Sequence, residues 1–294
     1  METKFGPLTL IPGENSGRYP YCHSLYVEAD LRVVIDPASD KKRLEQIKNG
    51  PGVDAVWLSH YHEDHFMYLN MFEDKKLWIS KADAPPLEDL EILLDYYGMN
   101  VQKDREFWRR VLLEDFNYRP RRADRLFKGE EIIDLAGVRV EVIPTPGHTP
   151  GHCSFFFPKP GLLFLGDYDL TPFGPYYGDA HSDIDATIVS VNRLRRIPAK
   201  VWVTSHETGL FLTDPGDIWD QYLAAIDERE AKLLDLLTAP RTMAKIVEAR
   251  ILYRKEREPK EFFDFSERAH MSKHLERLMV QGRVVRRGET YYRV

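Results

Sequence analysis

The chain contains very little cysteine: among its 294 residues only Cys22 and Cys153 are thiols. Two cysteines cannot form a disulfide framework, and they lack the paired spacing of a cysteine metal site, so we expect two buried free thiols. The N-terminus lacks the apolar core of a signal peptide. No apolar run approaches the roughly 20 residues needed to span a bilayer. These absences predict a cytoplasmic, reduced protein with no membrane partner.

The chain also lacks an excess of positive charge. Its formal net charge is −6, and 30% of its residues are charged. This balance argues against a surface that binds nucleic acid throughout, although it allows a local basic patch. Hydrophobic residues make up 43% of the chain, which is enough for a sizeable core. At roughly 100–200 residues per domain, the length favours one large domain, or a large one and a small one.

Alternating and continuous apolar runs predict many short strands in the first 216 residues. We expect strands at 24–28, 31–35, 53–59, 76–80, 131–134, 138–143, 152–157, 162–165 and 200–204. Helical periodicity is expected at 39–48, 87–97, 103–116 and 183–195. Residues 83–128 form a mainly helical insertion in this scheme, and such an insertion could serve as a lid.

The pattern changes at Thr213-Asp214-Pro215-Gly216, where turn residues interrupt the chain. Helices are expected at 217–237, around 243–247 and at 267–281, followed by a hairpin of strands at 283–287 and 290–293. This order is typical of a winged helix. The sequence therefore predicts two domains, a catalytic one at 1–216 and a small C-terminal winged-helix-like one at 217–294.

The strongest chemical signal is the run His60-Tyr61-His62-Glu63-Asp64-His65, directly after an apolar strand. It places four good metal ligands within six residues. On a loop, His60 and His62 can face one side while Asp64 and His65 face the other, which suits two metals. Imidazole and carboxylate ligands favour zinc, and iron or manganese are alternatives.

Three more predicted strands lead into a potential ligand. His148 lies in the turn Thr145-Pro146-Gly147-His148-Thr149-Pro150-Gly151-His152, Asp167 follows the run 163–166, and His206 follows the run 201–205. Ligands at strand ends that converge on one edge form a rigid site. We therefore expect these three residues to meet the 60–65 loop.

Together these residues resemble the motifs of the metallo-β-lactamase superfamily. The matching features are Asp36 after the second strand, the H-x-H-x-D-H run, the P-G-H-T-x-G-H turn, a Gly-Asp strand end and a final Ser-His. The resemblance covers about residues 15–215. It implies an α/β fold, the αβ/βα sandwich, in which two β-sheets pack together with helices outside.

The resemblance also implies a role for each residue. His60, His62 and His148 would bind one metal, and Asp64, His65 and His206 the other. Asp167 would bridge the two metals. Asp36 and His152 would orient the ligands without binding metal themselves.

A site of this kind implies metal-dependent hydrolysis. A hydroxide held between two divalent ions would attack a carbonyl carbon, while Asp64 and Asp167 neutralise charge and accept a proton. The leading hypothesis is a hydrolase of a small thioester, ester or lactone. A single-strand endonuclease or phosphodiesterase is an alternative. A mononuclear-iron persulfide dioxygenase shares the motif and also stays open, whereas histidine at position 62 argues against the di-iron redox branch.

Two regions bear on the substrate. Seven arginines in the insertion would either attract an anionic substrate or form a solvated, paired face: Arg105, Arg109, Arg110, Arg119, Arg121, Arg122 and Arg125. After Asp167, the residues Tyr168, Tyr177 and His181 are candidates for the wall of a substrate pocket.

The C-terminal tail resembles the winged-helix domain of a β-lactamase-like subfamily that includes an endoribonuclease. Residues 241–294 hold 14 basic and 8 acidic residues, whereas the rest of the chain holds 27 and 39. A basic winged helix can bind nucleic acid. In this family such a tail more often walls the active site or contacts a second subunit. Nucleic-acid binding, a wall of the active site, a homodimer contact and a non-enzymatic regulator role therefore remain open.

Overall fold

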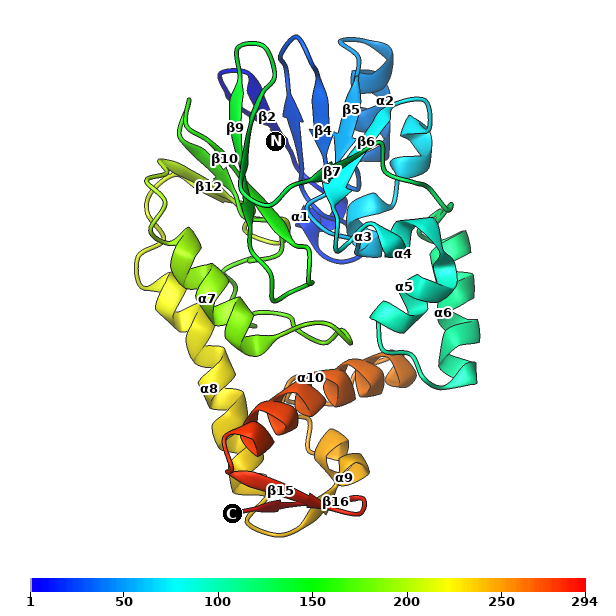
Figure 1. Cartoon of the computed structure of the whole chain (residues 1–294), viewed down its shortest axis with the longest axis vertical. Coiled ribbons are helices and arrows are strands. Elements are labelled where there is room, and N and C mark those ends of the chain that lie inside the picture. The colour runs from blue at the N-terminus through cyan, green and yellow to red at the C-terminus, as the bar shows by residue number, and fades with distance from the viewer. Residues whose placement is uncertain (1) are drawn as a thin grey trace.

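The computed structural model describes residues 2–294, and Figure 1 shows two β-sheets lying face to face above a mainly helical tail. The first sheet has its seven strands in sequence order, antiparallel from β1 to β4 and parallel from β4 to β7. These strands are β1 (Thr3–Phe5), β2 (Leu8–Ile11), β3 (Ser24–Val27), β4 (Val33–Ile35), β5 (Ala55–Trp57), β6 (Lys76–Ser80) and β7 (Arg125–Phe127).

The second sheet has the strand order β13-β12-β11-β10-β9-β8, in which only β11 and β12 are parallel neighbours. Its strands are β8 (Glu131–Asp134), β9 (Arg139–Pro144), β10 (Cys153–Phe157), β11 (Leu162–Phe164), β12 (Val201–Val203) and β13 (Leu210–Phe211). β10 and β11 are buried along their whole length, as expected for strands covered on both faces.

The main core lies between the two sheets. Trp57 of the first sheet and Phe155 of the second are fully buried, and their ring centroids are 5.5 Å apart. Helices cover the outer faces: α2 (Lys41–Asn49), α5 (Leu90–Tyr96) and α6 (Gln102–Glu114) on the first sheet, and α7 (Ile184–Leu194) and α8 (Ile218–Leu236) on the second. The predicted sandwich of two sheets with helices outside is confirmed.

Four short helices complete this part: α1 (Glu14–Gly17), α3 (Glu63–Phe66), η1 (Leu69–Phe72) and α4 (Pro85–Glu88). The stretch expected to be an insertion, 83–128, contains α4, α5 and α6, but it also contains β7, which forms the edge of the first sheet. Part of the stretch is therefore integral to the sandwich.

The tail consists of the end of α8, β14 (Arg241–Thr242), α9 (Met243–Glu248), α10 (Lys260–Val280), β15 (Val284–Arg287) and β16 (Thr290–Arg293). It has a core of its own, in which Leu233, Ile246, Met271 and Leu275 are buried together. The three helices and the final hairpin follow in the predicted order, the short strand β14 is additional, and the winged-helix assignment stays a prediction. Among residues 2–294, no helix has the length and apolar character to cross a membrane.

The start of helix α10 differs from the prediction. Helix α10 begins at Lys260, two turns before the expected start at 267. Pro259 directly precedes it as the N-cap residue, with an extended backbone. The extra turns carry aromatic rather than aliphatic residues, so an aliphatic pattern does not detect them. In Figure 1, α10 begins on the side of α5 and α6 and runs toward α8, below the sheets.

Candidate metal centre

The 60–65 loop is placed by strand β5, which ends three residues before His60. The chain then turns into α3, which begins at Glu63 and brings Asp64 and His65 onto the opposite side of the loop from His62. All six residues of the loop are buried. The sequence motif thus becomes a buried loop at the end of a central strand.

Three imidazole rings converge in the first half of the site. His148 Nε2 lies 3.1 Å from His60 Nε2 and 2.9 Å from His62 Nδ1. Burial is the main cause that lowers the pKa of His60, and the neighbouring histidines add to it. A neutral imidazole is the form that binds metals, so the lowered pKa of His60 suits a metal ligand.

The second half of the site joins Asp64, His65 and His206, whose ligand atoms all lie within 4.8 Å of one another. His206 Nε2 lies 3.5 Å from Asp64 Oδ2, and His65 Nε2 lies 3.9 Å from Asp64 Oδ1. These residues come from α3 and from the loop after β12, so two distant segments meet here.

Asp167 lies between the halves and faces both. Its Oδ2 is 3.2 Å from His148 Nε2 and 3.7 Å from His60 Nε2, whereas its Oδ1 is 2.8 Å from His65 Nε2 and 3.4 Å from His206 Nε2. One carboxylate oxygen thus serves each group of imidazoles, which is the arrangement expected of a bridging ligand.

The donor set fits divalent cations. His65 Nε2 and Asp167 Oδ1 are fully buried and form no hydrogen bond, although they lie 2.8 Å apart. Buried polar atoms without partners are rare and costly, so a cation bound at this point is expected. Three converging imidazole nitrogens beside a carboxylate are a ligand set that zinc, iron and manganese accept.

Comparison with known proteins identifies the family. The sequence profile of the metallo-beta-lactamase superfamily matches residues 20–206. This chain belongs to the metallo-beta-lactamase superfamily. The match contains all seven candidate ligands.

Relatives of the superfamily match in sequence and in fold. The chain is 24% identical over 143 residues to a probable metallo-hydrolase of Bacillus subtilis strain 168, covering 48% of this chain and 62% of the relative. It is 32% identical over 189 residues to a hydroxyacylglutathione hydrolase of Synechococcus sp. strain JA-3-3Ab, covering 61% and 60%. The chain therefore spans only about three fifths of the length of these curated relatives.

Solved structures resemble the whole chain, including its tail. A metallo-beta-lactamase family protein from Thermus thermophilus has a TM-score of 0.74 at 22% identity, covering 98% of this chain and 99% of its own. A beta-lactamase domain protein from Burkholderia ambifaria has a TM-score of 0.70 at 18% identity, covering 100% and 93%. At these identities the likeness shows a common fold.

The two residues expected to orient the superfamily ligands do contact them. Asp36 accepts hydrogen bonds from the Ser59 backbone N–H and hydroxyl, both at 2.7 Å, and lies 2.9 Å from His65 Nδ1. His152 Nε2 accepts the backbone N–H of Asp167 at 3.2 Å. Gly166 is needed beside it, because a Cβ there would lie 2.4 Å from His152 Nε2.

Other residues that contact the ligands belong to no recognisable motif, so the sequence does not predict them. The Asp179 carboxylate lies 2.6 Å from His62 Nε2 and also accepts the Tyr61 hydroxyl. Three further partners are backbone carbonyls: that of Tyr176 lies 3.0 Å from His148 Nδ1, and those of Gly17 and Tyr21 lie 2.8 and 3.0 Å from His206 Nδ1. Backbone acceptors leave no mark in a sequence.

A second carboxylate without a motif fixes the histidine turn. Asp83 accepts hydrogen bonds from the Thr149 hydroxyl at 2.5 Å and the Gly151 N–H at 2.7 Å. Burial outweighs these two bonds and raises the pKa of Asp83 to about 7. This side chain links the start of the predicted insertion to the loop that presents His148.

A cavity of about 490 Å³ opens above the metal centre. Its floor includes five candidate ligands: His62, Asp64, His148, Asp167 and His206. This volume lies within the usual range of roughly 300–1,000 Å³ for small-molecule sites. Half of the other lining residues are aromatic.

The three residues expected to wall this cavity do not reach it. The Tyr168 hydroxyl donates to the carbonyl of Thr145, the Tyr177 hydroxyl is bonded to Arg229 and His274, and His181 is exposed and packs on Tyr96. Tyr176, one residue away from Tyr177, lines the cavity instead. In an irregular loop, a shift of one position decides which ring faces inward.

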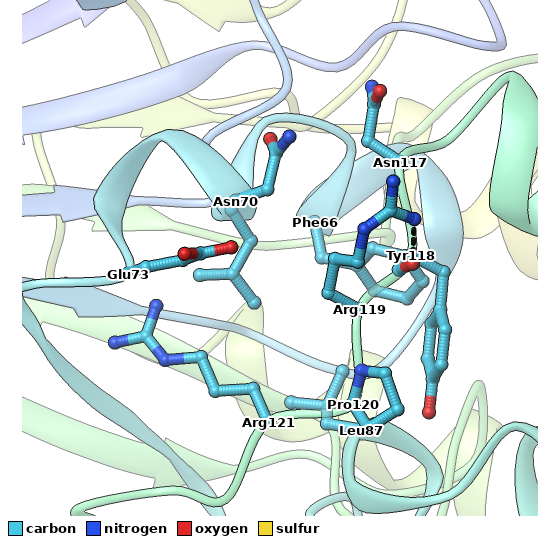
Figure 2. Close-up of a pocket in the computed structure, with 10 residues that line it drawn as sticks. Phe66, Asn70, Glu73, Leu87, Asn117, Tyr118, Arg119, Pro120 and Arg121 are labelled. Atoms are coloured by element: carbon cyan, nitrogen blue, oxygen red, sulfur yellow. Dashed lines mark hydrogen bonds between the residues drawn. The ribbon is translucent and has the colours of Figure 1, made fainter.

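A second cavity, of about 160 Å³, lies behind α3 and is shown in Figure 2. Arg119 and Arg121 line it, but the Arg119 guanidinium donates to the carbonyl of Tyr118, and that of Arg121 donates to the carbonyls of Phe72 and Lys75. None of its ten lining residues is a candidate ligand. None of the seven insertion arginines lines the larger cavity.

Proposed function

We propose that this protein is a hydrolase of small carbonyl esters, thioesters or lactones that acts through two divalent cations, most simply Zn²⁺. The observation that supports this proposal is the placement of Asp167 between two groups of imidazoles on the floor of a 490 Å³ cavity. When bound, such cations supply Lewis acidity, which activates water and polarises a carbonyl.

The side chains of this chain have distinct tasks in that scheme. His60, His62 and His148 would hold one cation, and Asp64, His65 and His206 the other. Asp64 and Asp167 are carboxylates at the cavity surface, so they can orient a water molecule and accept its proton. Asp36, His152 and Asp179 keep the ligands in place through the hydrogen bonds described above.

The shape of the cavity favours a small substrate over a nucleic acid. Aromatic residues from the tail and from the 83–128 stretch line the cavity at the metal centre, whereas a nuclease needs an open basic groove. Six carboxylate residues line the cavity, Glu63, Asp64, Asp167, Asp169, Asp179 and Glu207, and only two arginines do, Arg18 and Arg257. Acylated glutathione, the substrate that the name of one curated relative states, is a carbonyl compound of the proposed kind.

Elemental analysis of the purified protein and a substrate panel test the proposal. We expect two equivalents of divalent metal and turnover of at least one ester, thioester or lactone, lost on chelation and restored by zinc. Turnover of a phosphodiester alone would overturn the proposal, as would thiol-dependent oxygen uptake with one bound iron. An Asp167→Ala variant serves as the control for contaminating hydrolases.

A further inference from the structure

The cavity above the metal centre has a continuous aromatic roof, built from parts of the chain that lie far apart in sequence. We use this name for the cavity-lining rings Tyr19, Tyr97, Trp108, Phe173, Tyr253, Phe262 and Phe263. Phe262 is the junction: its ring centroid lies 5.6 Å from that of Trp108, 6.0 Å from that of Tyr19 and 5.1 Å from that of Phe263. The early turns of α10 thus meet α6 and the N-terminal loop over the floor.

Contacts among the roof rings leave part of their apolar surface accessible. Phe262 and Phe263 remain half-buried, and Phe173 is 40% exposed. Aromatic side chains that stay accessible inside a concave site offer apolar area for a ligand to cover. An apolar group resting on the roof would therefore gain the burial that these rings lack.

Most carboxylates of the cavity lie deep, whereas its two arginines lie near solvent. The buried floor carries the carboxylates Asp64 and Asp167, whereas Arg18, Arg257 and one carboxylate, Glu207, are exposed lining residues. Within residues 2–294, neither guanidinium forms an ion pair. The Arg257 guanidinium lies 5.5 Å from the Tyr253 ring centroid and 5.7 Å from that of Phe263, so the roof itself positions this charge.

We propose that the substrate is a thioester or ester with a bulky aromatic or apolar acyl group and an anionic carrier. The acyl group rests on the aromatic roof, and the anionic end lies at Arg18 and Arg257. This inference depends on the proposed function, because it names the substrate class of the same site. Phe262, Phe263 and Arg257 then determine specificity without taking part in bond cleavage.

Matched thioesters of 3-mercaptopropionate, one phenylacetylated and one acetylated, test the acyl preference. In the zinc-loaded wild type we expect the phenylacetyl compound to have the larger kcat/KM. Phe262→Ala and Phe263→Ala should each lower the ratio of the two kcat/KM values by about tenfold, the size expected when an apolar contact is lost. Glu261→Ala, exposed on the same helix and outside the cavity lining, should leave the ratio unchanged.

The carrier preference is tested with Arg257→Gln. Thioesters of 2-mercaptoethanol, which are neutral, should lose less activity in this variant than those of 3-mercaptopropionate. A binding measurement that needs no turnover completes the design. Calorimetric titration of the zinc-loaded protein with (2-phenylethylthio)acetate should show weaker binding to Phe262→Ala than to wild type, while circular dichroism checks that the variant is folded.

The outcomes separate the two proposals. If the wild type hydrolyses no ester or thioester, the proposed function fails. If it hydrolyses them with an acyl ratio that Phe262→Ala and Phe263→Ala leave unchanged, and the thioether binds equally to wild type and Phe262→Ala, the specificity proposal alone is overturned.

Discussion

The floor and the roof of the cavity are built on opposite principles. On the floor, each histidine ligand is held from behind by a specific partner, as Asp36 holds His65 and Asp179 holds His62. The roof is a set of rings in apolar contact, several of them half-buried. A metal site tolerates little displacement, whereas an apolar surface can repack. In our proposal, the floor therefore carries out the chemistry and the roof determines the choice of substrate.

The sharpest test of this division is a pair of histidine variants. His60→Ala removes a floor ligand, so kcat/KM should fall by about 10³-fold or more for every substrate alike. His181→Ala removes an exposed histidine outside the cavity lining, and activity should stay at the wild-type level. Turnover by His60→Ala equal to that of wild type, at matched metal content, would refute the assignment of the floor.

A smaller effect is expected from the support behind the floor. Asp179→Asn weakens the contact with His62 Nε2, so metal affinity should fall by about 10–100-fold while acyl preference stays unchanged. Competition with a chromophoric chelator measures this affinity. Asp185→Asn, at an exposed ion pair with Arg277, is the matched control. Equal affinities in the two variants would show that Asp179 does not support the site.

The tail is linked to the floor through the loop that carries Tyr176 and Tyr177. His270 of α10 accepts the backbone N–H of Tyr177 at 3.3 Å, next to the Tyr176 carbonyl that contacts His148. His270→Ala should lower the free energy of unfolding by about 1–3 kcal/mol, because a buried N–H loses its acceptor. Urea denaturation measures this loss against Arg268→Ala, an exposed neighbour. Identical stabilities would contradict the link.

The smallest expected effect is a loss of tail stability at low pH. Burial raises the pKa of Glu230, but hydrogen bonds from His274 and Arg277 outweigh burial and hold it below the usual 4.5. A lowered pKa in the folded state stabilises the fold above pH 4.5, and this stability is lost as the pH falls through the lowered value.

The melting temperature of wild type should therefore fall more steeply below about pH 4.5 than that of Glu230→Gln. Glu228→Gln, on the exposed side of α8, should behave like wild type. Parallel curves for wild type and Glu230→Gln would remove Glu230 from the acid response.

The contrast between floor and roof also explains which parts of the site can be predicted from the sequence. The floor ligands lie close together in sequence or directly after apolar strands, so a sequence pattern can identify them. The structure brings all seven together. The supports Asp36 and His152 belong to the same motifs. The two-sheet sandwich follows from apolar strand runs, although the predicted strands do not include β1, β2, β7 and β13.

The roof could not be derived in this way. Its rings come from four regions without a shared pattern, and α10 begins earlier than its aliphatic periodicity indicates. Tyr177 was expected in the cavity and Tyr176 occupies it, because loop geometry sets the facing of a side chain. The carbonyls of Gly17 and Tyr21 near His206 depend on the folded backbone alone.

The N-terminal loop shows how far the catalytic unit extends. The superfamily match begins at residue 20, yet the Gly17 carbonyl contacts His206 and the Tyr19 hydroxyl donates to Glu63 at 2.9 Å. A protein trimmed to the matched segment would lack both contacts and the α10 aromatics. Conversely, transplanting this roof onto another member of the superfamily would require moving four separate stretches together. The proposed selectivity would therefore be hard to acquire by exchanging a single block of sequence.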